Sequence, residues 1–143
     1  MYALLNSEGQ IQTYPYSVSQ LQADNPGTSF PSPMPDERLA DWNVVIVVPT
    51  EQPDYDPITQ NLTELTPEKI NDVWTQVWQV TDATPEEIAE RTAQYNEQQK
   101  QNRLLAYERE SDPIFFKWQR GEGTQQEWLD AVELVKQQYP YIT

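Results

Sequence analysis

The feature that most constrains the fold is a change of pattern at residues 82–87. Before it, short apolar runs are separated by clusters of turn-forming residues, which is typical of β-strands. At the change, Thr84, Pro85 and Glu87 supply an N-cap, a proline at the first helical position and a capping-box glutamate, which predict a helix start. We therefore expect an α+β protein in three segments: a small β-rich N-terminal domain at 1–82, a long connecting helix at 83–110 and a C-terminal helical hairpin at 111–143.

Two β-hairpins are expected before this boundary. The first pairs residues 2–6 with residues 10–14 across a turn that contains Gly9, and glycine adopts positive φ without strain. The second pairs residues 60–65 with residues 73–81. The first domain is therefore built largely from local strand pairs.

Shorter elements are expected between the hairpins. Ser17 can cap a short helix over residues 18–23, and Asp36 can cap one helical turn that reaches Ala40. Residues 44–48 are all Val or Ile, and such a continuous run predicts a strand that is covered on both faces or takes part in an interface.

The helix that starts at Pro85 is expected to run to about Glu110. Its middle, residues 94–103, has almost no apolar stripe, so no core can hold it. This stretch is expected to be either a solvated arm or a surface that packs on another chain. A weak, register-specific coiled coil is a further alternative.

The last segment is expected to fold into two short helices. Asp112 and Pro113 begin the first helix, which ends before Gly121, and Thr124 with Glu127 forms a capping box for the second. The second helix has one continuous apolar face, made of Trp128, Ala131, Val132, Val135 and Tyr139.

The composition argues against most enzyme classes. The chain contains neither Cys nor His, which removes thiol nucleophiles, imidazole bases and thiolate metal sites. We therefore expect a protein that is not an enzyme and that binds no cofactor and no metal. A carboxylate-based glycan hydrolase stays open as an alternative, although no sequence feature places two carboxylates in one cleft.

The net charge of −14 narrows the choice of partners. Nucleic acid and anionic membrane surfaces are both disfavoured, because binding them requires an excess of Lys and Arg. Residues 1–83 contain two basic side chains against twelve acidic ones. This excess serves either solubility or the recognition of a basic partner. No apolar run is long enough to span a membrane, and the first residues lack the pattern of a signal peptide.

Two stretches resemble proteins of tailed bacteriophages. Residues 14–31 carry Tyr14-Pro15-Tyr16, Leu21, Asn25-Pro26 and Phe30-Pro31, and this spacing resembles the opening of small proteins encoded near phage tail-fibre genes. In those proteins the motif follows a short hairpin and precedes a valine-rich strand. Residues 43–48 and the hairpin with Trp74 and Trp78 fit the same pattern.

The C-terminal part, residues 103–140, is similar to the phage tail assembly chaperone family. The matching residues are Arg103-Leu104-Leu105, Asp112, Trp128 and Tyr139-Pro140. Asp112 is followed here by Pro113-Ile114-Phe115-Phe116, whereas the family more often has a Trp at once. The resemblance implies a role in tail or tail-fibre assembly without catalysis.

The candidate partner-binding residues are aromatic, proline and neighbouring positions of these motifs. They are Tyr14, Pro15, Tyr16, Leu21, Asn25, Pro26, Phe30, Trp74, Trp78, Phe115, Phe116, Trp118 and Trp128. The alternative for each group is a purely interior role. For the strand at 73–81, whose two faces are both apolar, we expect a core on one side and a partner on the other.

The expected function is that of a structural or adaptor protein of the virion tail, bound to other tail, baseplate or fibre proteins. The alternative is a transient assembly chaperone in the host cytoplasm that is not retained in the virion. A second copy of the chain is a further candidate partner.

Overall fold

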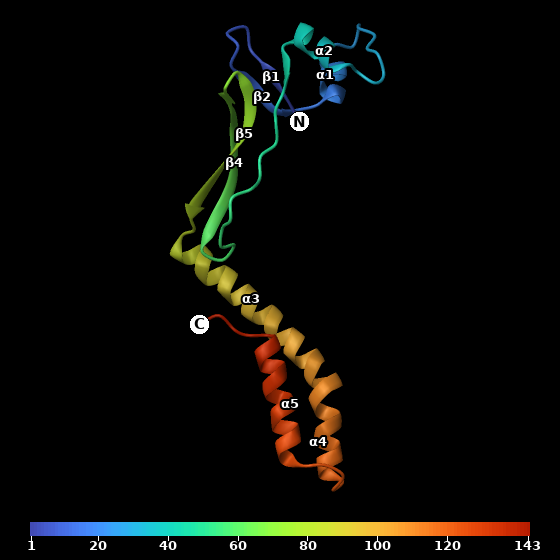
Figure 1. Cartoon of the computed structure of the whole chain (residues 1–143), viewed down its shortest axis with the longest axis vertical. Coiled ribbons are helices and arrows are strands. Elements are labelled where there is room, and N and C mark those ends of the chain that lie inside the picture. Colours follow the sequence, from blue (N-terminus) through green and yellow to red (C-terminus); the bar gives the residue numbers. More distant parts are fainter. The chain divides into compact units, whose positions relative to one another are not determined.

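The structure is a computed structural model that describes residues 1–143 and shows an α+β protein (Figure 1). The chain divides into two compact units, Met1–Asp82 and Ala83–Thr143. The first unit contains all of the strands and two short helices, and the second is helical. The helix that begins at Pro85, expected as a connecting segment, belongs to the second unit.

The first unit begins with a three-stranded antiparallel sheet. β1 (Tyr2–Leu5) lies between β2 (Ile11–Tyr16) and β3 (Val44–Ile46). In the turn between β1 and β2, Gly9 has a φ of 77°, and the side chain of Asn6 accepts two backbone hydrogen bonds of 2.9 Å. The first predicted hairpin is thus confirmed.

The apolar run at 44–48 is divided between two sheets, which differs from the single covered strand expected. β3 ends at Ile46, which is exposed, and Val47 is fully buried. The N–H of Val48 donates to the carbonyl of Trp74, and the N–H of Gln76 donates to the carbonyl of Val48, each at 2.9 Å. A strand covered on both faces is contradicted, because Ile46 and Val48 keep large exposed areas, and the alternative that this run takes part in an interface stays a prediction.

Two short helices and a 3-10 turn follow the first hairpin. Ser17 and Gln20 form a capping box for α1 (Val18–Asp24), as the sequence predicted in part. α2 (Asp36–Leu39) continues into the 3-10 turn Ala40–Trp42. Asp36 does not cap α2, because it is the first helical residue, and its carboxylate instead accepts a hydrogen bond from the Tyr2 hydroxyl at 3.3 Å.

These elements enclose a small core. Its fully buried members come from a strand end, from the two helices and from β3, and they are Tyr16, Leu21, Leu39 and Val44. Partly buried apolar residues surround them: Tyr2, Leu4, Val18, Phe30, Met34 and Trp42. Aromatic side chains thus contribute to both the centre and the shell of this core.

The second hairpin pairs β4 (Gln60–Ile70) with β5 (Val73–Asp82). Its turn places Asn71 and Asp72 at positive φ, as a tight two-residue turn requires. The first arm is longer than the predicted 60–65. The pairing register shifts between Leu65 and Glu68, a stretch that contains Pro67, and proline has no N–H to donate to the ladder.

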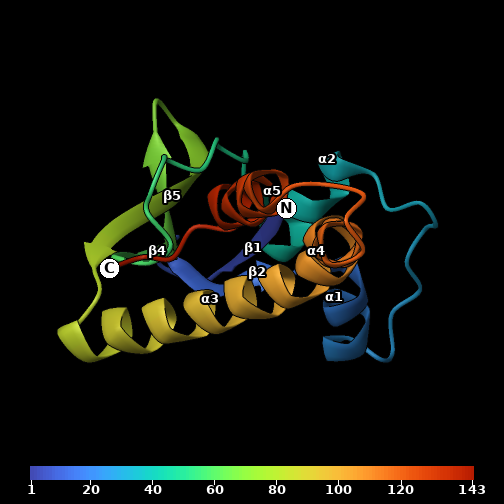
Figure 2. The same ribbon diagram turned by 90° about the horizontal axis from the view of Figure 1, so that it is seen from below.

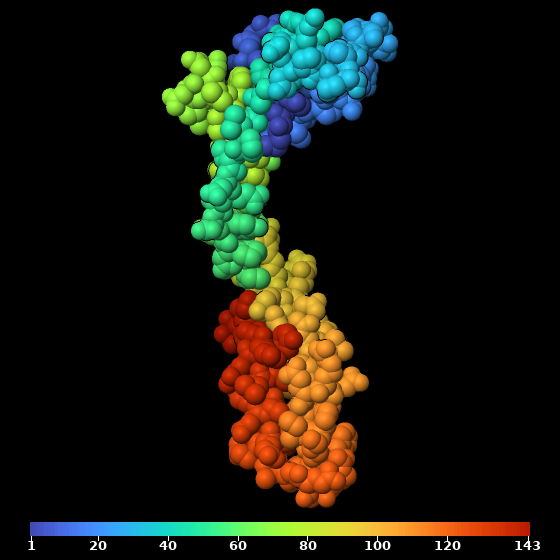
Figure 3. Space-filling model, turned by 45° about the vertical axis from the view of Figure 1, so that its right-hand side comes forward, coloured from blue at the N-terminus to red at the C-terminus, as the bar shows by residue number.

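The second unit consists of α3 (Pro85–Ala106), α4 (Asp112–Gln119) and α5 (Gln125–Gln138). The predicted capping boxes at Thr84 and Thr124 are both present. α4 and α5 lie side by side, joined by a tight turn (Figures 1 and 2). The space-filling view shows α5, in red, packed along the orange limb that contains the end of α3, residues 107–111 and α4 (Figure 3).

The long helix ends earlier than predicted. α3 stops at Ala106, and a π-helical stretch, Tyr107–Ser111, leads directly into α4. Pro113, in the first turn of α4, can neither donate to the carbonyl four residues before it nor pack against it as in an α-helix. A wider π turn just before a proline relieves this conflict, so the chain changes helix type instead of breaking.

The polar middle of α3 makes contacts within the second unit. The segment 139–142, which follows α5, lies against it. Asn96 and Ile142 are joined by two hydrogen bonds of 2.8 Å, and the Arg103 side chain contacts Tyr139 and Tyr141. The solvated alternative holds for the exposed side chains of this stretch, which are Gln94, Glu97, Gln98, Lys100 and Gln101. It is corrected for Asn96 and Arg103, whose side chains bind a segment of the same unit, and packing on another chain stays a prediction.

Candidate partner-binding surfaces

An aromatic cluster holds the two helices of the C-terminal hairpin together. The Phe115 ring lies 5.2 Å from that of Trp128, and Trp118 stacks on Trp128 with centroids 5.8 Å apart. All three side chains are half-buried. Ring pairs at these distances contribute about 0.5–1.5 kcal/mol beyond their buried area. Phe115, Trp118 and Trp128 thus serve chiefly as the interior of the hairpin.

The turn between α4 and α5 keeps this cluster in register. Gly121 adopts a φ of 75°, which only glycine adopts readily. Thr124 then caps α5 by accepting a hydrogen bond from the backbone N–H of Glu127, whose carboxylate accepts one from the N–H of Thr124. These local features place Trp128 opposite Phe115.

Phe116 differs from its aromatic neighbours because it points outward. Its side chain is 57% exposed, and several aliphatic side chains of the same unit are similarly exposed. These are Leu104, Leu105, Leu129 and Leu134. We call these five residues the exposed apolar set. Exposed side chains of this kind are candidates for contact with another protein.

Two hollows lie along the helical hairpin. One, of about 430 Å³, is lined by Leu104, Tyr107, Trp128 and Val132 among others. The other, of about 500 Å³, has a mixed lining. Apolar and acidic residues both contribute to it, among them Ile114, Ala131, Leu134, Glu127 and Asp130. A pair of helices leaves a groove uncovered, because a third helix is needed to close it.

Two of the candidate residues in the first unit are interior. Tyr16 and Leu21 are 6% and 2% exposed, so neither side chain can contact a partner. The Tyr16 hydroxyl donates to the Asp24 carboxylate at 2.7 Å. Burial, together with this acceptor, raises the pKa of Tyr16 to about 12. The prediction that these residues bind a partner is therefore wrong, since the core needs them.

The remaining residues of this motif either support the local structure or are exposed to solvent. Asn25 donates from its side-chain amide to the carbonyl of Leu21 at 2.9 Å and so closes the end of α1. Pro15 and Pro26 are exposed. Phe30 packs against Trp42 with ring centroids 5.2 Å apart. Of these four residues, Pro15 and Pro26 are the ones whose side chains are exposed to solvent.

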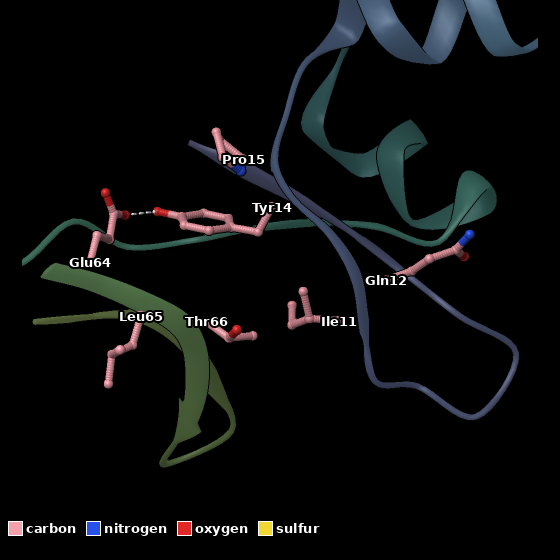
Figure 4. A pocket seen from close by; sticks show the side chains of 7 residues that line it. All are labelled: Ile11, Gln12, Tyr14, Pro15, Glu64, Leu65 and Thr66. Carbon is pink, nitrogen blue, oxygen red and sulfur yellow. Dashed lines mark hydrogen bonds between the residues drawn. The ribbon is translucent and has the colours of Figure 1, made fainter.

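Tyr14 takes part in a polar link between the two sheets of the first unit (Figure 4). Its hydroxyl donates a short hydrogen bond to Glu64, which also accepts from the buried side chain of Gln76 at 2.8 Å. Burial and the Glu64 acceptor raise the pKa of Tyr14 to about 12. Beside this link lies a hollow of about 350 Å³, which Pro15 also lines. The network joins β2 to β4 and β5.

Trp74 and Trp78 share one face of β5, and both are half-buried. The indole N–H of Trp78 is buried without a hydrogen-bond acceptor. On the opposite face Val73 is exposed and Val77 is half-buried. The strand therefore presents apolar side chains on both faces.

Two features were missed by sequence reasoning. Phe30, Arg38 and Trp42 line a hollow of about 580 Å³, together with Met34 and four flanking residues, of which two are prolines. The other is the contact of segment 139–142 with α3. One sequence signal for this contact is a stripe of polar residues at helical spacings of three and four, namely Asn96, Gln99 and Arg103. The other is Pro140, which ends the last predicted helix and is followed by an apolar, uncharged segment.

No group of three or more carboxylates is arranged to hold a metal ion. None of the helices combines the length and the apolar composition that crossing a membrane requires. Comparison with protein-family models, with curated proteins and with solved structures gave no match to this chain. Function has to be inferred from the side chains and from the sequence resemblances.

Proposed function

We propose that this chain is a protein-binding component of a bacteriophage tail or tail-fibre assembly, and that it acts as an adaptor retained in the virion. The observation that carries the binding role is the exposed apolar set of the second unit. The tail context comes from the resemblance of residues 14–31 and 103–140 to phage proteins.

The exposed apolar set suits a binding role. Its side chains would be removed from water only if another chain covered them or if this chain changed conformation. Phe116 and Leu134 are 57% and 61% exposed, while the neighbouring Phe115 is half-buried. Aromatic and aliphatic side chains of this kind form the centres of protein interfaces. Catalysis is not required by any feature of this surface.

A transient assembly chaperone is the second candidate function. It is favoured by the similarity of Arg103-Leu104-Leu105, Asp112 and Trp128 to the phage tail assembly chaperone family. A chaperone and an adaptor use the same contacts and differ in how long they remain on the particle.

Mass spectrometry of purified virions separates these two functions. A stoichiometric amount of the chain in virions supports the adaptor. Absence from virions, combined with co-purification of tail or fibre proteins from infected cells, supports the chaperone. Absence from both preparations would contradict the proposal.

A pair of variants on α4 tests whether the exposed apolar set is responsible. Phe116→Ser should reduce co-purification of the tail partner by about tenfold or more, because loss of an interface anchor costs about 2 kcal/mol. Gln119→Ser, at another exposed position of α4, is the matched control and should leave co-purification unchanged. Equal behaviour of the two variants would remove Phe116 from the interface.

A further inference from the structure

We propose that Asn96, Gln99 and Arg103 on α3 form a binding site for an extended Tyr-Pro-Tyr-Ile segment, and that segment 139–142 of a second copy can replace the chain's own. We call these three residues the α3 site. The spacings of three and four residues place them on one stripe of the helix.

The α3 site recognises backbone as well as side chains. The Asn96 amide donates to the carbonyl of Ile142 and accepts from its N–H, both at 2.8 Å. A side-chain amide that pairs with both groups of one residue replaces the neighbour that an extended strand would have. This contact specifies an extended segment and not a helix.

Arg103 recognises the aromatic part of the segment. Its Nε donates to the carbonyl of Tyr139 at 2.8 Å, and its guanidinium lies 3.9 Å from the centre of the Tyr141 ring. A second donation, of 3.3 Å, reaches the carbonyl of Lys136 at the end of α5. Arginine combines a rigid fork of donors with a planar face that stacks on aromatic rings. The Arg103 side chain thus binds the backbone carbonyl of Tyr139 and the aromatic ring of Tyr141.

The chain's own segment fills this site incompletely. The side-chain oxygen of Gln99 is buried and accepts no hydrogen bond. Tyr141 and Ile142 remain 44% and 37% exposed. Within segment 139–142, the N–H of Tyr139 also donates to the carbonyl of Val135 at 3.2 Å, whereas the hydrogen bonds of residues 140–142 all go to the α3 site. Such a segment can exchange with an identical one.

A second copy is the occupant that these observations favour. Its segment has the sequence that the α3 site is seen to accept, and residues 139–143 carry no charged side chain. Exchange of identical segments needs no new recognition, which makes it a low-cost route to dimers. Because each copy has a net charge of −14, repulsion between copies opposes the exchange, and added salt should favour it.

This inference deepens the proposed binding role and rests on it only in that the chain binds protein. The adaptor proposal is tested on virions, whereas the exchange is tested on the purified chain. Failure of either result therefore leaves the other test intact.

The first experiment measures binding of a fluorescent peptide with the sequence of residues 137–143 to the chain truncated after Gln138. Fluorescence anisotropy should show saturable binding, and the full chain should bind more weakly because its own segment competes. Asn96→Ala in the truncated chain should lower the affinity by about tenfold, a loss equivalent to about 1.4 kcal/mol. Gln98→Ala is the control, since its side chain contacts only Asn102 of the same helix, and it should bind normally.

The second experiment measures the mass of the full chain by sedimentation over a wide range of concentrations. A monomer–dimer equilibrium that strengthens with salt, and that is absent in the truncated chain and in Asn96→Ala, supports exchange with a second copy. A truncated chain that fails to bind the peptide overturns the site. Peptide binding together with a full chain that stays monomeric overturns the second copy as occupant and indicates a different partner with the same kind of segment.

Discussion

The two units are held together in different ways. The first closes a core in which Tyr16, Leu21, Leu39 and Val44 are nearly inaccessible to water. In the second unit the buried residues are small: Ala83, Ala106, Ser111 and Val135. Its large aromatic side chains are only half covered, and Phe116 is exposed. Both units expose large apolar side chains, for example Ile70 in the first and Leu134 in the second, so the two units differ in what they bury and not in what they expose.

The largest expected effect comes from truncating the core of the first unit. Leu21→Ala should reduce the free energy of unfolding by about 2–5 kcal/mol, because it removes buried methyl groups and leaves a cavity. Leu134→Ala in the second unit should change it by no more than about 0.5 kcal/mol, because that side chain is exposed. Hydrogen exchange followed by mass spectrometry reports each unit separately. Equal destabilisation by both variants would break the comparison.

A smaller effect is expected at the centre of the second unit. Val135 is fully buried, and Val135→Ala should cost about 1–3 kcal/mol in that unit alone. Amide exchange should therefore accelerate in α3 to α5 and stay unchanged in the first unit. Faster exchange throughout the chain would show that the two units unfold together.

The cap of α5 tests how far local signals support the second unit. Thr124→Ala should reduce the free energy of unfolding by about 1 kcal/mol, because the N–H of Glu127 loses its acceptor. Thr124→Ser keeps an acceptor oxygen and should lose much less. Thermal unfolding followed by circular dichroism measures both variants, and an unaffected Thr124→Ala protein would show that packing alone holds the helix.

The smallest effect under ordinary conditions concerns alkaline pH. The pKa of Tyr16 is raised from 10.0 to about 12 in the folded state, so ionisation favours the unfolded chain. The contribution of Tyr16 to stability is fully present below pH 10 and is lost as the pH rises towards about 12. Tyr16→Phe should unfold with a weaker dependence on pH across this window. Tyr14, whose pKa is raised to about 12 as well, leaves a residual slope in that variant. An identical pH profile for Tyr16→Phe and wild type would contradict this role.

Local chemistry made much of the fold predictable. The Gly9 turn, the capping boxes at Thr84 and Thr124, and the glycine after α4 depend on residues within a few positions of one another. The candidate site was less predictable. The motif at residues 14–31 contains Tyr and Pro side chains that suit an interface, yet Tyr16 and Leu21 are in the core. Burial depends on which distant segments cover a residue, and no local pattern contains that information.

The sequence by itself determined the α+β class, the position where strands give way to helices, and the starts of the long helices, because dihedral preferences and end-capping act over a few residues. Only the tertiary structure decided that residues 44–48 divide between two sheets, and that Asn96 and Arg103 bind residues more than thirty positions away. These outcomes arise from contacts between segments far apart in the chain, whose choice depends on how the whole unit packs.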